Sequence, residues 1–88
     1  MLLRTLPLIA ALTILPGAAL ADEDVPLDSL PPAAKATVLR EVKGGQILDV
    51  ERDTKRGKVV FEVEFVEGGK NWEIHVAEDG TLLSRRPD

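Results

Sequence analysis

The sequence is 88 residues long, which is enough for one small domain but not for two. It contains no cysteine, which excludes disulfide scaffolds, zinc fingers, iron–sulfur ligation and thiol catalysis. The formal net charge is −4, from 15 acidic and 11 basic residues, and this argues against nucleic acid as the main partner. The chain must therefore hold its fold by core packing alone.

Residues 1–21 have the pattern of a cleaved secretory signal peptide. Arg4 precedes a mostly apolar run, and a Pro-Gly pair and an Ala-Leu-Ala ending follow it, so that the mature chain is expected to begin at Asp22. The run is too short for a membrane span, which needs about 20 unbroken apolar residues. We therefore expect a periplasmic or secreted protein that keeps no stable membrane anchor after cleavage.

The mature chain is expected to begin with a flexible segment and a helix. Residues 22–28 are acidic, contain proline and show no periodicity, which is typical of a flexible lead-in. Apolar residues then recur every fourth position, which predicts an amphipathic helix of about three to four turns. The stripe consists of Leu30, Ala34, Val38 and Val42, with Leu39 beside it. Ser29 or Leu30 is the expected N-cap, and Gly44-Gly45 is expected to end the helix in a left-handed conformation.

After the double glycine the period changes to two residues, which is typical of β-strands. The clearest strand covers residues 58–66. Its expected buried face consists of Val59, Phe61, Val63 and Phe65, and its other face of Val60, Glu62, Glu64 and Val66. Residues 71–76 repeat the pattern, and Trp72 is expected to be the largest core side chain.

Two weaker strands complete the predicted set. In residues 46–54, Leu48 and Val50 are expected to point inward, although Ile47 breaks the strict alternation. Residues 81–85 form a short last strand, and every connection between strands is short and contains glycine, which favours antiparallel hairpins. Residues 29–88 thus predict a single α+β domain: one N-terminal helix packed on one face of a four-stranded antiparallel meander sheet.

Three segments between Leu30 and Ser84 follow the pattern of a known family: PPAAKATVLREVKGGQILDVERD, KVVFEVEF and NWEIHVAEDGTLL. In this order of elements the chain resembles the PepSY and PepSY-like domains, which are named for peptidase propeptides. The resemblance implies an exported α+β domain with a fold similar to that of β-lactamase inhibitor proteins. It also implies a non-catalytic binding or regulatory role, in which the domain restrains a peptidase or another envelope protein.

The sequence offers little for catalysis or for a cofactor. His75 is the only histidine, and a single imidazole without cysteine makes a poor transition-metal site. The only serines, Ser29 and Ser84, lie at the ends of elements, and no His–Asp spacing supports either as a nucleophile. We therefore predict that the protein is not an enzyme and has no catalytic residue, no metal site and no cofactor.

The outward face of the predicted sheet is the candidate site. Five acidic residues and the histidine share its phase: Asp49, Glu51, Glu62, Glu64, Glu73 and His75. Because like charges on neighbouring strands cost stability, this face calls for an explanation. One interpretation is a solvated face that keeps the protein soluble, and the other is a docking surface for a basic protein partner. The alternative function is that of a structural envelope protein that forms a homodimer through uncovered edge strands.

Overall fold

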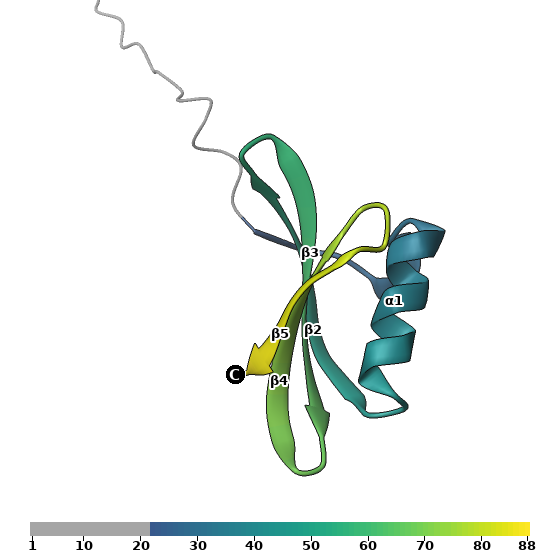
Figure 1. Ribbon diagram of the computed structural model, residues 1–88, viewed down its shortest axis with the longest axis vertical. Coiled ribbons are helices and arrows are strands. Elements are labelled where there is room, and N and C mark those ends of the chain that lie inside the picture. The colour runs from purple at the N-terminus through teal and green to yellow at the C-terminus, as the bar shows by residue number, and fades with distance from the viewer. Residues whose placement is uncertain (1–21) are drawn as a thin grey trace, which may run out of the picture.

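The computed structural model describes residues 22–88, so the predicted signal peptide lies outside the described residues. One helix covers one face of a five-stranded antiparallel sheet with the order β1-β2-β3-β4-β5 (Figure 1). In chain order the elements are β1 (Glu23–Asp24), a 3-10 helix (Leu27–Ser29), α1 (Pro32–Val42), β2 (Gln46–Lys55), β3 (Lys58–Glu67), β4 (Lys70–Ala77) and β5 (Leu82–Pro87). The α+β class is thus confirmed. Within the described part of the chain, no helix has the length and apolar character that crossing a membrane requires.

The sheet has one strand more than the four predicted. β1 pairs with β2 through Glu23 opposite Arg52 and Asp24 opposite Glu51. The Arg52 guanidinium also contacts the Glu23 carboxylate at 3.2 Å, and the Val25 N–H donates to the Val50 carbonyl at 3.0 Å. The predicted lead-in over residues 22–28 thus contains a short strand and a 3-10 helix, which the sequence did not indicate because elements of two or three residues are too short to show a period.

The ends of α1 differ from the prediction by one or two residues. The N-cap is Pro31 and no side chain caps the helix, whereas the Ser29 hydroxyl donates to the Pro26 carbonyl at 2.7 Å. At the other end Lys43 already has the left-handed conformation, with φ of +54°, and Gly44 continues it with φ of +80°. The glycine pair thus follows the reversal instead of starting it.

The apolar stripe of α1 packs on the inner face of the sheet and forms the core. Its buried members are Leu30, Ala34, Val38, Val42, Val50, Phe61, Val63, Phe65, Ile74 and Val76. Phe65 is the largest fully buried side chain, whereas Trp72 is only partly buried at the edge of this cluster. The prediction that Trp72 is the largest core residue was wrong, since Trp72 lies near the start of β4 and its side chain is only partly buried there.

Arg85 closes the core at that edge, a role that the sequence did not indicate. Its guanidinium carbon lies 4.7 Å from the centre of the Trp72 ring and 5.4 Å from that of Phe65. The same group contacts the Glu67 carboxylate at 2.6 Å and the Glu41 carboxylate of α1 at 3.1 Å. One arginine of β5 therefore joins the helix to the sheet.

Two β-bulges explain the two exposed leucines of the sheet. The pairing of β2 with β3 shifts between Ile47 and Asp49, and that of β4 with β5 shifts at Val76, so that Leu48 and Leu83 have no paired residue. Both side chains are exposed, at 45% and 51%. The expectation that Leu48 points inward was wrong, because the extra residue of a bulge reverses the alternation and turns Ile47 inward instead.

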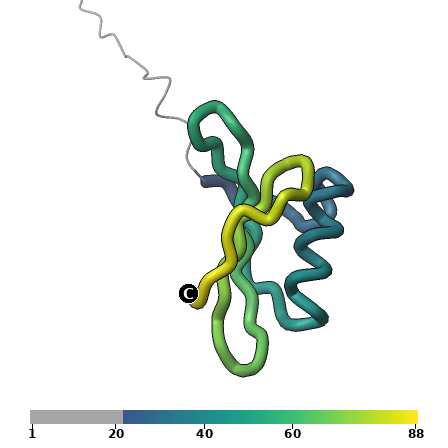
Figure 2. Tube along the Cα trace, viewed as in Figure 1, coloured from purple at the N-terminus to yellow at the C-terminus, as the bar shows by residue number. Residues whose placement is uncertain are grey.

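The connection between β4 and β5 lies against the N-terminal half of α1 (Figure 2). The buried Thr37 hydroxyl donates to the Gly80 carbonyl at 2.6 Å. A Cβ at Gly80 would lie 2.8 Å from the Ala33 carbonyl oxygen, and the φ of Gly80 is +91°. Only glycine therefore allows the turn and the helix to approach this closely.

Replacing Phe65 by alanine is expected to lower the free energy of unfolding by about 3 to 5 kcal/mol, most of the stability of a domain of this size. Trp72→Ala is expected to cost less, because the ring is only partly buried. Urea unfolding followed by circular dichroism measures both. If Phe65→Ala does not fold, Phe65→Leu should fold with a loss below about 1.5 kcal/mol. An equal loss for the Phe65 and Trp72 variants would contradict the assignment.

Gly80→Ala is expected to destabilise the protein more than Gly57→Ala. Both glycines have positive φ, but a Cβ at Gly57 meets no atom within 4 Å, whereas one at Gly80 meets the backbone of Ala33. Gly57→Ala therefore measures the backbone strain alone, about 1 to 2 kcal/mol. Thermal unfolding of the two variants compares them, and equal losses would mean that α1 moves away from the turn without cost.

Candidate functional site: an acidic sheet face

Two cross-strand rows place the predicted site residues side by side on the face of the sheet that α1 leaves open. The first row consists of Asp24, Glu51, Glu62, His75 and Ser84, one from each strand in turn. The second consists of Asp49, Glu64, Glu73 and Arg86. Directly opposed residues in such rows have Cβ atoms about 4.5 to 5.5 Å apart. The sheet thus brings together all six predicted site residues, which we call the acidic face.

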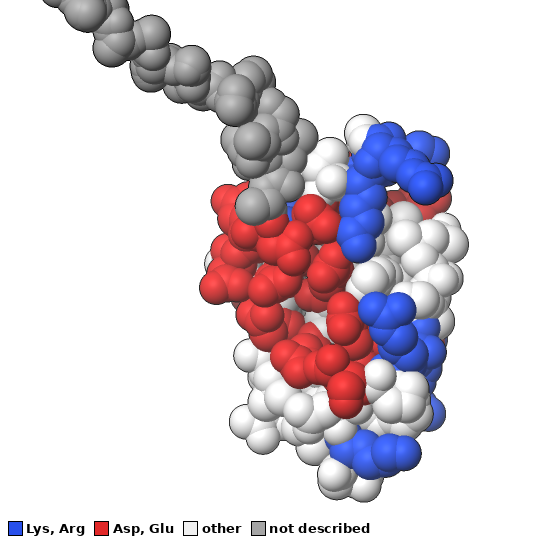
Figure 3. Space-filling view, turned by 90° about the vertical axis from the view of Figure 1, so that its left-hand side faces the viewer, with Lys and Arg blue, Asp and Glu red and all other residues white. Residues whose placement is uncertain are grey.

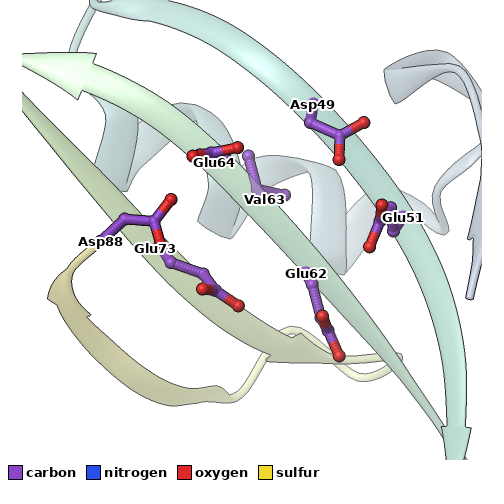
Figure 4. A pocket seen from close by; sticks show the side chains of 7 residues that line it. All are labelled: Asp49, Glu51, Glu62, Val63, Glu64, Glu73 and Asp88. Atoms are coloured by element: carbon purple, nitrogen blue, oxygen red, sulfur yellow. The ribbon is translucent and has the colours of Figure 1, made fainter.

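Six carboxylates line a shallow depression of about 240 Å³ in the acidic face (Figure 4). Five of them are the predicted residues, and the sixth is Asp88. The sequence did not indicate Asp88, because it lies beyond the predicted last strand. Its N–H donates to the Asn71 carbonyl at 2.9 Å, which extends the pairing of β5 with β4 and brings the carboxylate back to the sheet.

Positive charges lie at the margin of the acidic face. The space-filling view shows a continuous group of acidic side chains with basic ones beside it (Figure 3). The Lys55 ammonium contacts the Glu62 carboxylate at 3.1 Å, and the Arg86 guanidinium is 4.0 Å from that of Glu73. Among residues 22–88, no basic group lies within 4.0 Å of the carboxylates of Glu51 or Glu64. The centre of the face therefore has unbalanced negative charge.

Crowding of carboxylates makes two of them hold protons more tightly. A hydrogen bond shared with Asp49, followed by partial burial and the nearby Asp22, raises the pKa of Glu51 to about 7. A hydrogen bond with Asp88, followed by partial burial and neighbouring charges, also raises the pKa of Glu64. Both shifts have the same physical cause: carboxylates lie close together, and the ionised form of each is disfavoured.

His75 lies within the row that crosses the sheet. Its Nε2 atom is 2.7 Å from a Glu73 carboxylate oxygen, and Glu62 is directly opposite on β3. On the other side Ser84 is its neighbour, and the Ser84 hydroxyl oxygen is buried without a hydrogen-bond partner among the described residues. His75 is therefore enclosed by polar groups from three strands.

Comparison with known protein families, with curated proteins and with solved structures finds no match for this chain. The PepSY resemblance stays an expectation from the sequence.

The raised pKa of Glu51 makes the stability of the protein depend on pH. Its carboxyl titrates near pH 7 in the folded state and near its ordinary value of 4.5 in the unfolded chain. Between these values the folded state binds more protons, so stability falls as the pH rises from about 4.5 to about 7. We expect a higher Tm at pH 5.5 than at pH 8, and a smaller difference for Glu51→Gln.

Glu78→Gln is the control, because Glu78 is exposed in the turn after β4 and belongs to neither row. Thermal unfolding at the two pH values measures the difference. An identical pH response of Glu51→Gln and the wild type would show that Glu51 does not carry the effect.

Proposed function

We propose that the protein is a non-catalytic binding module whose acidic face docks on a basic surface of another exported protein. The observation that carries the proposal is the depression lined by six carboxylates on the face of the sheet opposite α1. Export itself rests on the leader pattern of the sequence and is part of the proposal. The periplasm or the extracellular space would be the site of action.

Charge complementarity favours a basic partner. Glu51 and Glu64 lack a basic neighbour within the described residues, and the nearby Asp49 and Asp88 raise the pKa values of their carboxyls. Lysine or arginine side chains of a partner would supply positive charge there and relieve the repulsion between opposed carboxylates. The partner would thus gain charge-assisted contacts at a surface that the fold has already arranged.

The resemblance to PepSY domains supports a more specific form of this role. In that form the acidic face contacts a basic region of a peptidase or another envelope protein and restrains it. The proposal involves no reaction, so the binding test does not depend on knowing the activity of the partner.

Reversing the charge at the centre of the face is expected to slow association. After capture from envelope extract, the partner is identified and purified, and its association rate with the mature protein is measured at low and high salt. Glu51→Lys with Glu64→Lys should reduce the rate at least tenfold at low salt, because electrostatic steering is lost. High salt should remove most of the difference.

Asp28→Lys with Glu78→Lys is the matched control, since it changes the net charge equally on exposed residues outside the two rows. This variant should bind nearly as fast as the wild type. If both double variants reduce the association rate equally, only the net charge matters and the acidic face is a solvated surface.

Self-association through edge strands is the alternative function. The exposed Leu83 on the edge strand β5 favours it. The bulges at Leu48 and Leu83 and the shortness of β1 oppose it, because such features hinder the addition of another strand. A concentration-dependent dimer in sedimentation equilibrium, without binding to any basic protein, would favour the alternative.

A further inference from the structure

Glu62, Glu73 and His75 form a compact group of oxygen and nitrogen donors within the acidic face. One ligand atom from each, two carboxylate oxygens and an imidazole nitrogen, lies within 4.8 Å of the others. Ligands of a zinc ion are each about 2.0 to 2.2 Å from the metal. Small side-chain rotations would therefore bring all three atoms around one ion.

The sheet holds the three side chains in this arrangement. Glu62 and His75 are directly opposed on β3 and β4, and Glu73 lies two residues before His75 on the same face. Their side chains are only 14%, 15% and 23% exposed for Glu62, His75 and Glu73, respectively. Partly buried donors on paired strands lose less conformational freedom on binding an ion than long side chains in solution do.

A metal ion at this site would replace two existing contacts of the three side chains. The 2.7 Å contact between His75 Nε2 and the Glu73 carboxylate requires a proton, and a metal ion can take the place of that proton. The Lys55 ammonium contacts Glu62 at 3.1 Å, but it also lies 3.7 Å from Asp53 and is nearly half exposed. Lys55 can therefore keep Asp53 as a partner when Glu62 binds an ion.

Ser84 provides a second, independent indication. Its hydroxyl oxygen is buried next to His75 in the row and has no hydrogen-bond partner among residues 22–88. Buried polar groups are normally paired, often with a water molecule. A water molecule bound to an ion at this site would give the hydroxyl a partner.

We propose that Glu62, Glu73 and His75 bind one divalent transition-metal ion of the zinc type. Two carboxylates balance the charge of such an ion, and the imidazole favours it over Ca²⁺ and Mg²⁺, which prefer oxygen ligands. The remaining coordination positions would hold water. The sequence alone predicted no metal site, because a single histidine without cysteine makes a poor transition-metal site and the pattern did not show whether Glu62 or Glu64 lies opposite His75. This proposal does not rest on the docking function.

The test uses the mature chain without a histidine tag and ZnCl₂ as the probe. Because His75 is the only histidine, its imidazole signals in a nitrogen-15 NMR spectrum can be assigned without ambiguity. We expect these signals to shift on addition of one equivalent of Zn²⁺, and isothermal titration calorimetry to give one site. CaCl₂ at the same concentration should leave the imidazole signals unchanged.

Three variants separate a defined site from general attraction to the acidic face. Glu73→Gln should weaken Zn²⁺ binding at least tenfold, whereas Glu64→Gln, which removes the same charge from the directly opposed residue, should retain it. His75→Gln should also weaken binding at least tenfold without any loss of negative charge, and circular dichroism confirms the fold of each variant. Equal Zn²⁺ affinity of His75→Gln and the wild type, or equal weakening by both glutamine variants, would overturn the proposal.

Discussion

A single helix can bury only one face of a sheet, and the rest of this structure depends on that constraint. α1 has eleven residues and places one apolar stripe on the inner face. The sheet is antiparallel and its strands alternate, so every second residue is left on the opposite face. Most residues on that face are polar, although Val60 also lies there, and most of the charged ones are acidic. The alternation that places apolar residues in the core thus also places the acidic residues together on the open face.

The features that could be predicted from the sequence are those set by local periodicity. The alternation in residues 58–66 correctly assigned Phe61, Val63 and Phe65 to the core and Glu62 and Glu64 to the open face. The short glycine-containing turns predicted antiparallel hairpins, which was enough to gather the site residues on one face but not to decide whether Glu62 or Glu64 lies opposite His75.

The features that could not be predicted arise from pairing at the ends of strands. β1 and Asp88 join the sheet through contacts with distant residues, and no local pattern marks them. The bulge at Leu48 looks like a simple break in alternation in the sequence, and only the partner strand shows which residue is the extra one. From the sequence, Arg85 is expected to be an exposed polar residue at the end of a strand. In the structure its guanidinium lies over the rings of Trp72 and Phe65.

The two proposals share one physical cause. Opposed pairs such as Glu51 with Glu62 and Glu64 with Glu73 lower the stability of an isolated domain. Places where a sequence departs from the rule that favours stability are frequently functional sites. A basic partner and a metal ion would both add positive charge where the chain itself does not, the partner across the whole acidic face and the ion only at Glu62, Glu73 and His75.

The charges of the molecule are distributed unevenly between its helix side and its sheet side. Lys35, Arg40 and Lys43 lie on the helix or at its end, on the side of the sheet opposite the six carboxylates. Charges of opposite sign on opposite sides of a thin two-layer domain produce an electric dipole moment across the layers. In the field of a charged neighbour such a molecule rotates before it makes contact, so that the first encounter presents the sheet to cations.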